Sequence, residues 1–355
     1  MSGKVMVKGT EAIAEAAIRA GCRLYFGYPI TPQSELPEYM ARRMPEKDVN
    51  GVFLQAESEV AAVNMIYGAA CTGKRSLTST SSPGFSLMQE SMSYMAGAEL
   101  PAVFVNVVRG GPGLGDIQPA QCDYFQATKG GGHGDYRLLV YGPESLQEAV
   151  ELTVKAFDMA EKYRNPVLLL ADGLLGQMME PVEFPDFTDL EKLEKNSSWA
   201  LQGTELTRKA HKVTSFNIDP VGLEKMNINL QKKYAEMEKN ERMYEEYMME
   251  DAEVVIVSYG TIGRIAKSVA KMARNKGIKA GVFRPITLWP FPYAELAKWA
   301  RKETKLFFTV EMSAGQMIED VRLAVEGRCP VKFYGRMGGM VPTPTEIFDK
   351  LMELV

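Results

Sequence analysis

The 355-residue sequence contains few of the side chains that hold metals and clusters. It has only four cysteines and two histidines, and no two cysteines form a CxxC pair. Scattered cysteines of this number exclude a disulfide framework, and a cubane cluster normally needs four thiolates, several at short spacing. A zinc site is also excluded without cysteine help. We therefore expect reduced, mostly packed thiols at Cys22, Cys71, Cys122 and Cys329, and any iron–sulfur centre on another chain.

The sequence also lacks long apolar runs and an excess of one charge. No stretch approaches about 18 uninterrupted apolar residues, and the opening MSGKVMVKGTEA has no signal-peptide core. The formal charge is −4, the pI is near 5.6, and acidic and basic residues are mixed along the sequence. Such a sequence does not predict a basic surface for binding nucleic acid. These features favour a cytoplasmic protein that binds neither membranes nor polyanions.

Alternating strand-like and helix-like segments dominate the first half. PAVFVNVV (101–108) and NPVLLLAD (165–172) are apolar runs typical of strands buried on both faces. SLQEAVELTVKAFDMAEKY (145–163) has the apolar spacing of an amphipathic helix. Strands that alternate with such helices predict βαβ units and a parallel sheet. We expect this α/β domain to span residues 1–185.

A second α/β pattern follows a polar segment. Residues 186–250 are charged, and the regular charge spacing over 230–253 predicts a connector helix. Strand-like VVIVSYG (254–260) then begins a smaller α/β domain over 251–355, in which KAGVFRPITLWP (279–290) predicts one strand.

Three places in the first domain put polar groups at strand ends or glycine turns, where open α/β sheets carry their sites. Thr31 lies between two prolines in GYPITPQSE, a pattern that by itself favours a turn. Arg109 follows a buried strand, where a guanidinium can hold a carboxylate with two parallel hydrogen bonds. Its glycine-rich neighbour GGPGLG matches neither a dinucleotide nor a Walker pattern.

The third place, QAESEVAAVNM, opens a predicted helix with two carboxylates, Glu57 and Glu59. Acids at a helix start gain about 0.3–1 kcal/mol from the helix dipole, which is enough to explain Glu57. Glu59 precedes VAAV and lies nearer the buried face, where a carboxylate needs a specific partner. Spacing alone does not decide which of the two is functional.

One further motif is misleading. LLADGLLG (169–176) is similar to the GDG that opens the magnesium and diphosphate motif of thiamine enzymes, but Ala171 replaces the first glycine and no paired asparagines follow. We expect the metal-binding half of such a site elsewhere, and we interpret His133 in KGGGHGDY as an ordinary loop residue.

Five segments together resemble one family. YPITP, QAESE, TSTSSPGFSLM, VNVVRGGPG and GDIQPAQCDYFQATKGGGHGDYR, followed by VVIVSYGT and FRPITLWPFP, are similar to the alpha-type subunit of 2-oxoacid:ferredoxin oxidoreductases. The resemblance covers essentially the whole chain. It implies a thiamine-enzyme pyrimidine-binding domain followed by a transketolase C-terminal-like domain.

The resemblance also implies a shared cofactor and site residues. Thiamine diphosphate would be held jointly with a diphosphate-binding beta-type subunit, and Mg²⁺ and [4Fe-4S] clusters would lie on partner chains. A gamma-type subunit, a ferredoxin-like cluster subunit, ferredoxin and coenzyme A complete the implied set. Glu59 would contact the cofactor's aminopyrimidine, while Arg109 and Thr31 would face the 2-oxoacid. Further cofactor contacts would come from Tyr28, Pro29, Ile30, Pro83, Gly84 and Phe85.

Within the family, the segments most resemble subunits for branched-chain 2-oxoacids such as 3-methyl-2-oxobutanoate, with 2-oxoglutarate as the alternative. A second basic residue facing the substrate tail would favour 2-oxoglutarate. Lys129 is the candidate, and the preferred interpretation is that its side chain is simply solvated. Two other readings stay open, namely half of a non-redox thiamine-dependent decarboxylase and a non-catalytic assembly subunit in which Glu59 only starts a helix.

Overall fold

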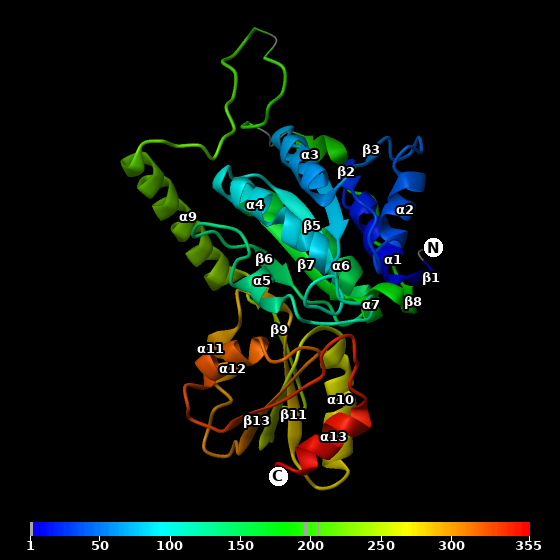
Figure 1. The fold of residues 1–355 in the computed structure, drawn as a ribbon, viewed down its shortest axis with the longest axis vertical. Helices are drawn as coiled ribbons and strands as arrows, with labels where there is room; N and C mark the ends of the chain where they lie inside the picture. The colour runs from blue at the N-terminus through cyan, green and yellow to red at the C-terminus, as the bar shows by residue number, and fades with distance from the viewer. Residues whose placement is uncertain (1–2, 195–197, 205) are drawn as a thin grey trace.

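The chain folds around two large β-sheets that lie one above the other in Figure 1, and it also forms a two-stranded antiparallel sheet. The computed structural model describes residues 3–194, 198–204 and 206–355. The upper sheet has seven strands in the order β12-β6-β7-β5-β4-β2-β3, and the lower sheet has five in the order β14-β13-β10-β11-β9. The predicted α/β fold class is therefore confirmed.

The upper sheet is parallel from β6 to β3, with β12 added antiparallel at one edge. Its two central strands are buried along their whole length, as their apolar sequences predict. The strands are β2 (Leu24–Gly27), β3 (Val52–Gln55), β4 (Ser76–Thr80), β5 (Ala102–Val108), β6 (Leu139–Tyr141), β7 (Pro166–Asp172) and β12 (Thr287–Trp289).

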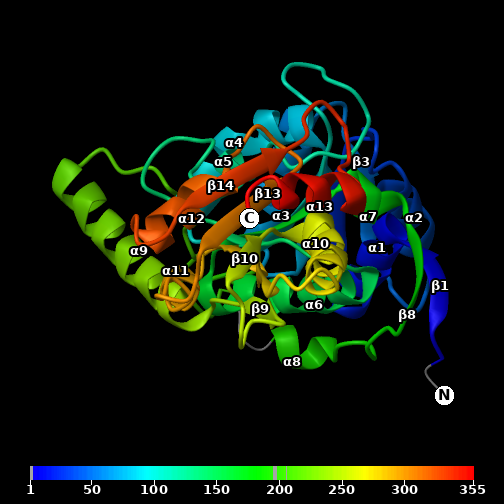
Figure 2. The ribbon, with the colours of Figure 1, turned by 90° about the horizontal axis from the view of Figure 1, so that it is seen from below.

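Helices cover both faces of this sheet (Figures 1 and 2). One face carries α3 (Glu59–Cys71) and α4 (Ser82–Gly97), which pack on each other and on the strands. The other face carries α1, α2 and α6, and α1 contacts both of the others. The remaining elements of this part are β1 (Val5–Lys8), β8 (Met179–Val182), α1 (Gly9–Arg19), α2 (Glu35–Arg43), α5 (Tyr124–Thr128), α6 (Leu146–Tyr163), α7 (Gly173–Gln177) and α8 (Leu190–Glu194).

The lower sheet is parallel except for its edge strand β9. Helices α10 and α13 pack together beside it, and α11 and α12 pack together on the other side in Figure 1. Its elements are β9 (Tyr244–Tyr247), β10 (Val254–Val257), β11 (Ala280–Pro285), β13 (Leu306–Glu311), β14 (Val331–Gly335), α10 (Gly260–Arg274), α11 (Tyr293–Ala297), α12 (Met317–Val325) and α13 (Pro344–Met352).

Two elements differ from the sequence prediction. The expected helix over 230–253 is instead α9 (Pro220–Asn240) followed by β9, because Glu245 of β9 pairs with the buried Arg284 on β11. The predicted strand 279–290 divides into β11 and β12, which belong to different sheets. The segment expected as a connector therefore contributes a strand to the lower sheet, and the expected second domain contributes one to the upper sheet.

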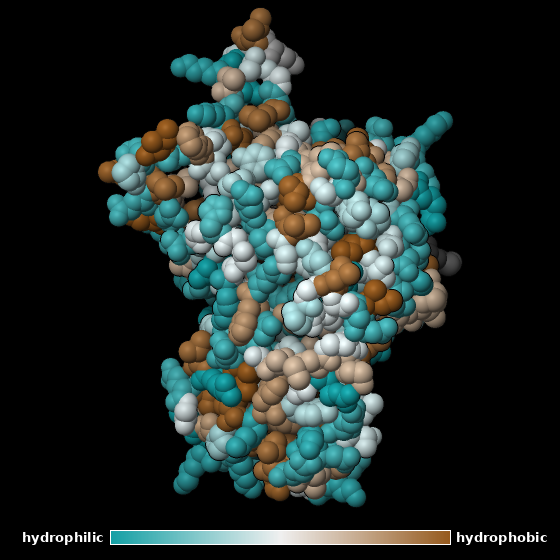
Figure 3. Space-filling model, viewed as in Figure 1, coloured by the Kyte–Doolittle hydropathy of each residue, from teal (hydrophilic) through white to brown (hydrophobic). Residues whose placement is uncertain are grey.

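An exposed apolar patch lies where α9 begins. Residues 206–219 extend beyond the body of the molecule before the helix, at the upper left of Figure 1. Phe216, Ile218 and Val221 there are 75%, 80% and 71% exposed, and Figure 3 shows the hydrophobic side chains on this part of the surface. Such clusters are typical of contact surfaces between proteins.

Candidate active site

The sequence-predicted residues meet at one edge of the upper sheet. Thr31 follows β2, Glu59 follows β3, Pro83 and Gly84 follow β4, and Arg109 follows β5. These four strands are neighbours in the sheet and run parallel, so their carboxyl ends share an edge. Sites in open α/β sheets lie at this edge.

Glu59 and Glu57 differ in exposure. Ser58 caps α3 by accepting a hydrogen bond from the backbone N–H of Ala61 at 3.1 Å, so the helix start does not depend on either acid for its cap. Glu59 is only 6% exposed, whereas Glu57 is exposed to solvent. Only Glu59 therefore provides a carboxylate enclosed by the protein, a choice that residue spacing did not make.

The start of α4 leaves room for that carboxylate. A β-carbon built on Gly84 would lie 2.6 Å from Glu59 Oε1 and 2.1 Å from Thr80 Oγ1. Both distances are too short for any side chain larger than hydrogen. Pro83 is half-buried next to this corner, but Phe85 is fully buried in the hydrophobic core. The Phe85 side chain thus packs inside the domain, away from solvent.

Arg109 and Thr31 are brought together. The Arg109 Nη1 donates to the Thr31 carbonyl oxygen at 2.9 Å, and Nη2 donates to the Leu114 carbonyl oxygen at 2.8 Å. Arg109 is 6% exposed, and its Nε has no hydrogen-bond partner among the described residues although it is buried. A buried unpaired donor is costly, which makes this guanidinium suited to an arriving anion. In the segment 28–31 that follows β2, Tyr28 and Ile30 are half-buried, and Pro29 and Thr31 are exposed.

Asp123 supports the two neighbouring strand ends, and sequence reasoning did not single it out. Its Oδ2 accepts hydrogen bonds from Ser82 Oγ at 2.7 Å and from Asn106 Nδ2 at 2.8 Å. Ser82 Oγ in turn accepts from the backbone N–H of Arg109 at 3.1 Å. Burial is the main cause that raises the pKa of Asp123 above its ordinary value. In the sequence, Asp123 stands in the segment GDIQPAQCDYFQATKGGGHGDYR, but nothing in that segment indicated a function for it.

A cavity of about 390 Å³ adjoins Thr31. Its walls include Pro32, Ile117 and Leu174, and its charged lining residue is Glu35. Glu35 accepts hydrogen bonds from Lys8 Nζ at 3.1 Å and Gln177 Nε2 at 3.0 Å. The cavity therefore has a mixed lining of apolar and neutral polar residues, with one paired carboxylate.

Lys129 and His133 lie away from this cavity. Lys129 forms an ion pair with Asp320 of α12, which also accepts a hydrogen bond from the Tyr124 hydroxyl at 2.6 Å. Lys129 thus links the two parts of the molecule. His133 is an exposed loop residue, in keeping with its interpretation from the sequence.

Asp172 of the LLADGLLG segment has a structural contact set. Its Oδ1 caps α7 by accepting from the backbone N–H groups of Leu174 and Leu175, both at 3.0 Å. Its Oδ2 accepts from the Thr261 hydroxyl on α10, across the junction of the two parts. Burial raises the pKa of Asp172.

Burial disfavours the thiolate form of the four cysteines. All four cysteines are free, and burial raises the pKa of Cys22 and of Cys122 to about 12 in each case. Both are therefore protonated at neutral pH. No group of three or more His, Cys, Asp or Glu that could hold a metal occurs in the described part of the chain.

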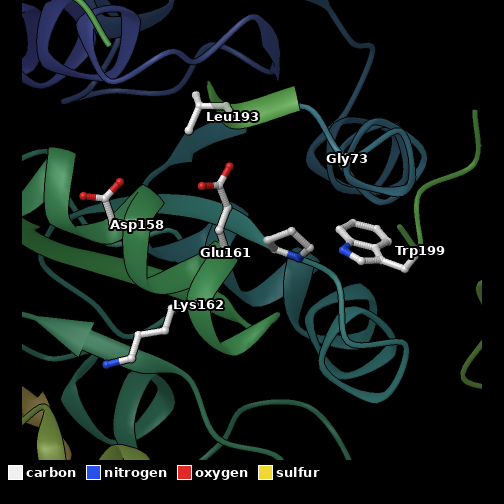
Figure 4. Close-up of a pocket in the computed structure, with 7 residues that line it drawn as sticks. Gly73, Asp158, Glu161, Lys162, Leu193 and Trp199 are labelled. Carbon is white, nitrogen blue, oxygen red and sulfur yellow. The ribbon is translucent and has the colours of Figure 1, made fainter. Parts of the chain in front are cut away.

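A separate pocket of about 290 Å³, drawn in Figure 4, lies at the opposite edge of the sheet. It is lined by Gly73 and Pro101, which precede β4 and β5, and by Asp158 and Glu161 of α6. Both acids pair with the buried Arg75, at 2.7 and 2.6 Å. The one Arg75 guanidinium thus serves both carboxylates as an ion-pair partner within the fold.

Comparison with known proteins identifies the family. The family model described as "Pyruvate flavodoxin/ferredoxin oxidoreductase, thiamine diP-bdg" matches residues 15–249, and "Pyruvate:ferredoxin oxidoreductase core domain II" matches residues 252–347. The chain belongs to this family. It is a subunit of the thiamine diphosphate-dependent 2-oxoacid:ferredoxin oxidoreductases, as the resemblance implied.

Individual relatives extend this result over the whole chain. The ketoisovalerate oxidoreductase subunit VorB of Methanothermobacter marburgensis is 51% identical, covering 98% of this chain and 97% of its own. The 2-oxoglutarate synthase subunit KorA of the same organism is 35% identical, covering 99% of both chains. The structure of 2-oxoglutarate:ferredoxin oxidoreductase from Magnetococcus marinus matches with a TM-score of 0.87 at 26% identity; the match covers 99% of this chain and 65% of that longer one.

The described residues fit the pyrimidine half of a thiamine diphosphate site. Glu59 offers an enclosed carboxylate at the sheet edge, the kind of group that the resemblance assigns to the cofactor's pyrimidine ring. The glycine at position 84 keeps space open beside it. No helix in the described chain is long and apolar enough to cross a membrane.

Proposed function

We propose that this chain supplies the pyrimidine-side half of an active site that oxidatively decarboxylates a branched-chain 2-oxoacid, best represented by 3-methyl-2-oxobutanoate, to an acyl-coenzyme A with reduction of ferredoxin. The observation that carries the site assignment is the buried Glu59 carboxylate at the carboxyl edge of the sheet, against Gly84. Thiamine diphosphate, when bound, supplies the carbon nucleophile that this chemistry requires.

Each residue has a distinct task in this proposal. Glu59 shares a proton with a pyrimidine ring nitrogen, because an enclosed carboxylate is a strong acceptor for it. Arg109 binds the substrate carboxylate through its unpaired Nε–H and a remaining terminal N–H, since its backbone contacts use two donors only. Thr31 donates a hydrogen bond near the 2-oxo oxygen, where negative charge develops.

The preference for a branched apolar tail has two supports. The ketoisovalerate subunit is 51% identical to this chain and the 2-oxoglutarate subunit 35%. In addition, the cavity beside Thr31 presents Ile117 and Leu174 together with the acidic Glu35. None of the described residues that line this cavity is a lysine or arginine that could pair with the second carboxylate of 2-oxoglutarate, and Lys129 is engaged by Asp320.

The partner requirement follows from what this chain offers. The LLADGLLG segment carries neither the opening glycine nor the asparagines of a diphosphate motif, and Asp172 is used as a cap. We assign the diphosphate, Mg²⁺ and [4Fe-4S] clusters to partner chains, namely a beta-type subunit, a gamma-type subunit and a ferredoxin-like subunit.

A surface next to the site suits the beta-type partner. Leu114 and Ile117 of the loop after β5 are 80% and 55% exposed, and Met337 and Met340 of the loop after β14 are 60% and 51% exposed. The two loops touch, because a β-carbon on Gly339 would lie 2.4 Å from Gln118 Cβ; they extend side by side in Figure 2. Their continuity with the half-site makes them the face for the chain that completes it.

The test is a substrate panel on the assembled complex. The chain is co-expressed with its partner subunits, and coenzyme A-dependent reduction of ferredoxin is followed with several 2-oxoacids. We expect kcat/KM for 3-methyl-2-oxobutanoate to exceed that for 2-oxoglutarate by at least about tenfold, the difference that 1.4 kcal/mol of transition-state binding gives. A preference for 2-oxoglutarate contradicts the substrate assignment, and turnover without ferredoxin or another electron acceptor favours a non-redox decarboxylase.

A further inference from the structure

Strand β4 carries a buried hydroxyl with no partner close to the candidate site. Thr80, the last residue of β4, is 2% exposed, and its Oγ1 has no hydrogen-bond partner in the part of the chain that the structure describes. A buried hydroxyl normally finds an acceptor, because leaving it unpaired costs free energy. An unpaired one at a strand end near a site therefore requires an explanation.

The geometry identifies its acceptor. Thr80 Oγ1 and Glu59 Oε1 converge on the same point above Gly84, at 2.1 and 2.6 Å from the position of an added β-carbon. Both oxygens thus border the space that the missing β-carbon of Gly84 leaves free. A rotation of the Thr80 hydroxyl or the Glu59 carboxylate into this space would bring donor and acceptor together, whereas a larger residue at 84 would occupy it.

We propose that Thr80 is a positioning residue for Glu59, its hydroxyl donating a hydrogen bond that fixes the carboxylate toward the cofactor, with Gly84 providing the space for this contact. The inference rests on the role proposed for Glu59. A charge-assisted hydrogen bond of this kind is short and directional, so it restricts the carboxylate to one rotamer. The hydroxyl acts through Glu59 and does not itself touch the reacting atoms.

Thr78 is a matched control on the same strand. It is two residues earlier, so its side chain points to the same face as Thr80, and its Oγ1 is likewise buried without a partner among the described residues. Its distance from the strand end keeps it away from Gly84, whose nearest side-chain neighbours are Thr80 and Glu59. Thr78→Val and Thr80→Val therefore make the same chemical change in similar surroundings, and only the second removes the proposed donor.

The experiment compares Thr80→Val, Thr80→Ser and Thr78→Val in the assembled complex. Melting temperature, the dissociation constant of thiamine diphosphate by calorimetry, the rate of deuterium exchange at the cofactor's C2 and the KM for the 2-oxoacid are measured for each. We expect Thr80→Val to slow exchange by about tenfold and to weaken cofactor binding severalfold, with KM unchanged, as loss of a hydrogen bond to a charged group implies. Thr80→Ser keeps the hydroxyl and should restore both values to within about threefold.

Other outcomes separate the hypotheses. A purely structural hydroxyl predicts that both valine variants keep normal exchange and gain stability, because a methyl group replaces an unpaired polar atom. That result overturns the inference, as does an equal loss of exchange in Thr78→Val. If Glu59→Gln is inactive while Thr80→Val is normal, only the Thr80 inference fails. If Glu59→Gln is also normal, the proposed function itself fails.

Discussion

Replacing Glu59 with glutamine tests the candidate site most directly. The substitution keeps the size of the side chain and one oxygen acceptor but removes the charge that shares a proton with the cofactor. We expect catalysis to fall by about 10²–10⁴-fold, the usual contribution of a general acid or base. Folding should be little affected, because Ser58 still caps α3 through the Ala61 N–H.

The structural cost can be bounded from the position of Glu59. It is the first residue of α3 and is buried, so neutralising it removes a helix-dipole interaction of at most about 2 kcal/mol. For a domain of this size that corresponds to a melting-temperature decrease of no more than about 8 °C. Glu57 is exposed at the same helix start and provides the control, since Glu57→Gln changes the same charge without altering an enclosed group.

The assay uses complexes reconstituted with each variant. Melting temperature, deuterium exchange at the C2 of bound thiamine diphosphate and 2-oxoacid-dependent ferredoxin reduction are measured side by side. Loss of exchange and turnover in Glu59→Gln alone, with both variants folded, supports the assignment. Wild-type exchange in Glu59→Gln, or inactivity confined to Glu57→Gln, would refute the reasoning.

Three further predictions follow from the same structure. Arg109→Ala should raise KM and lower kcat/KM by an amount equivalent to about 2–4 kcal/mol of lost substrate binding. Arg109→Lys should restore the activity only in part, because lysine lacks the planar guanidinium that forms two parallel hydrogen bonds. Unchanged steady-state kinetics in Arg109→Ala would mean that Arg109 has a purely structural role. The isolated chain should be colourless and inactive alone, and stoichiometric iron and sulfide in the pure protein would contradict the assignment of clusters to partners. Burial raises the pKa of Asp172, so its contribution to wild-type stability is present below its unfolded pKa and is lost as pH rises through the folded pKa. Urea unfolding of Asp172→Asn at about pH 4, near the unfolded pKa, and at about pH 8 should show the variant gaining stability relative to wild type at the higher pH. A constant difference between the two proteins would be inconsistent with this titration.

Local sequence determined the elements of the fold and the types of residue at their ends. Apolar runs such as 165–172 and amphipathic spacing such as 145–163 correspond to β7 and α6, because burial on both faces or on one face leaves a periodic record in the sequence. The absence of clustered thiolates is the reason for predicting that any cluster lies on another chain. The choice of Glu59, Arg109 and Thr31 as site residues came from the family resemblance, and their roles are predictions.

Only the tertiary structure decided which polar groups are enclosed and which strands join which sheet. Glu57 and Glu59 are chemically identical and two residues apart, and they differ because α4 and Gly84 cover one of them. Lys129 has its partner Asp320 nearly two hundred residues away, and β9 and β12 pair with strands distant in sequence. Such pairings depend on long-range packing and burial. Local periodicity in the sequence does not indicate which distant residues meet, so these pairings become visible only in the folded chain.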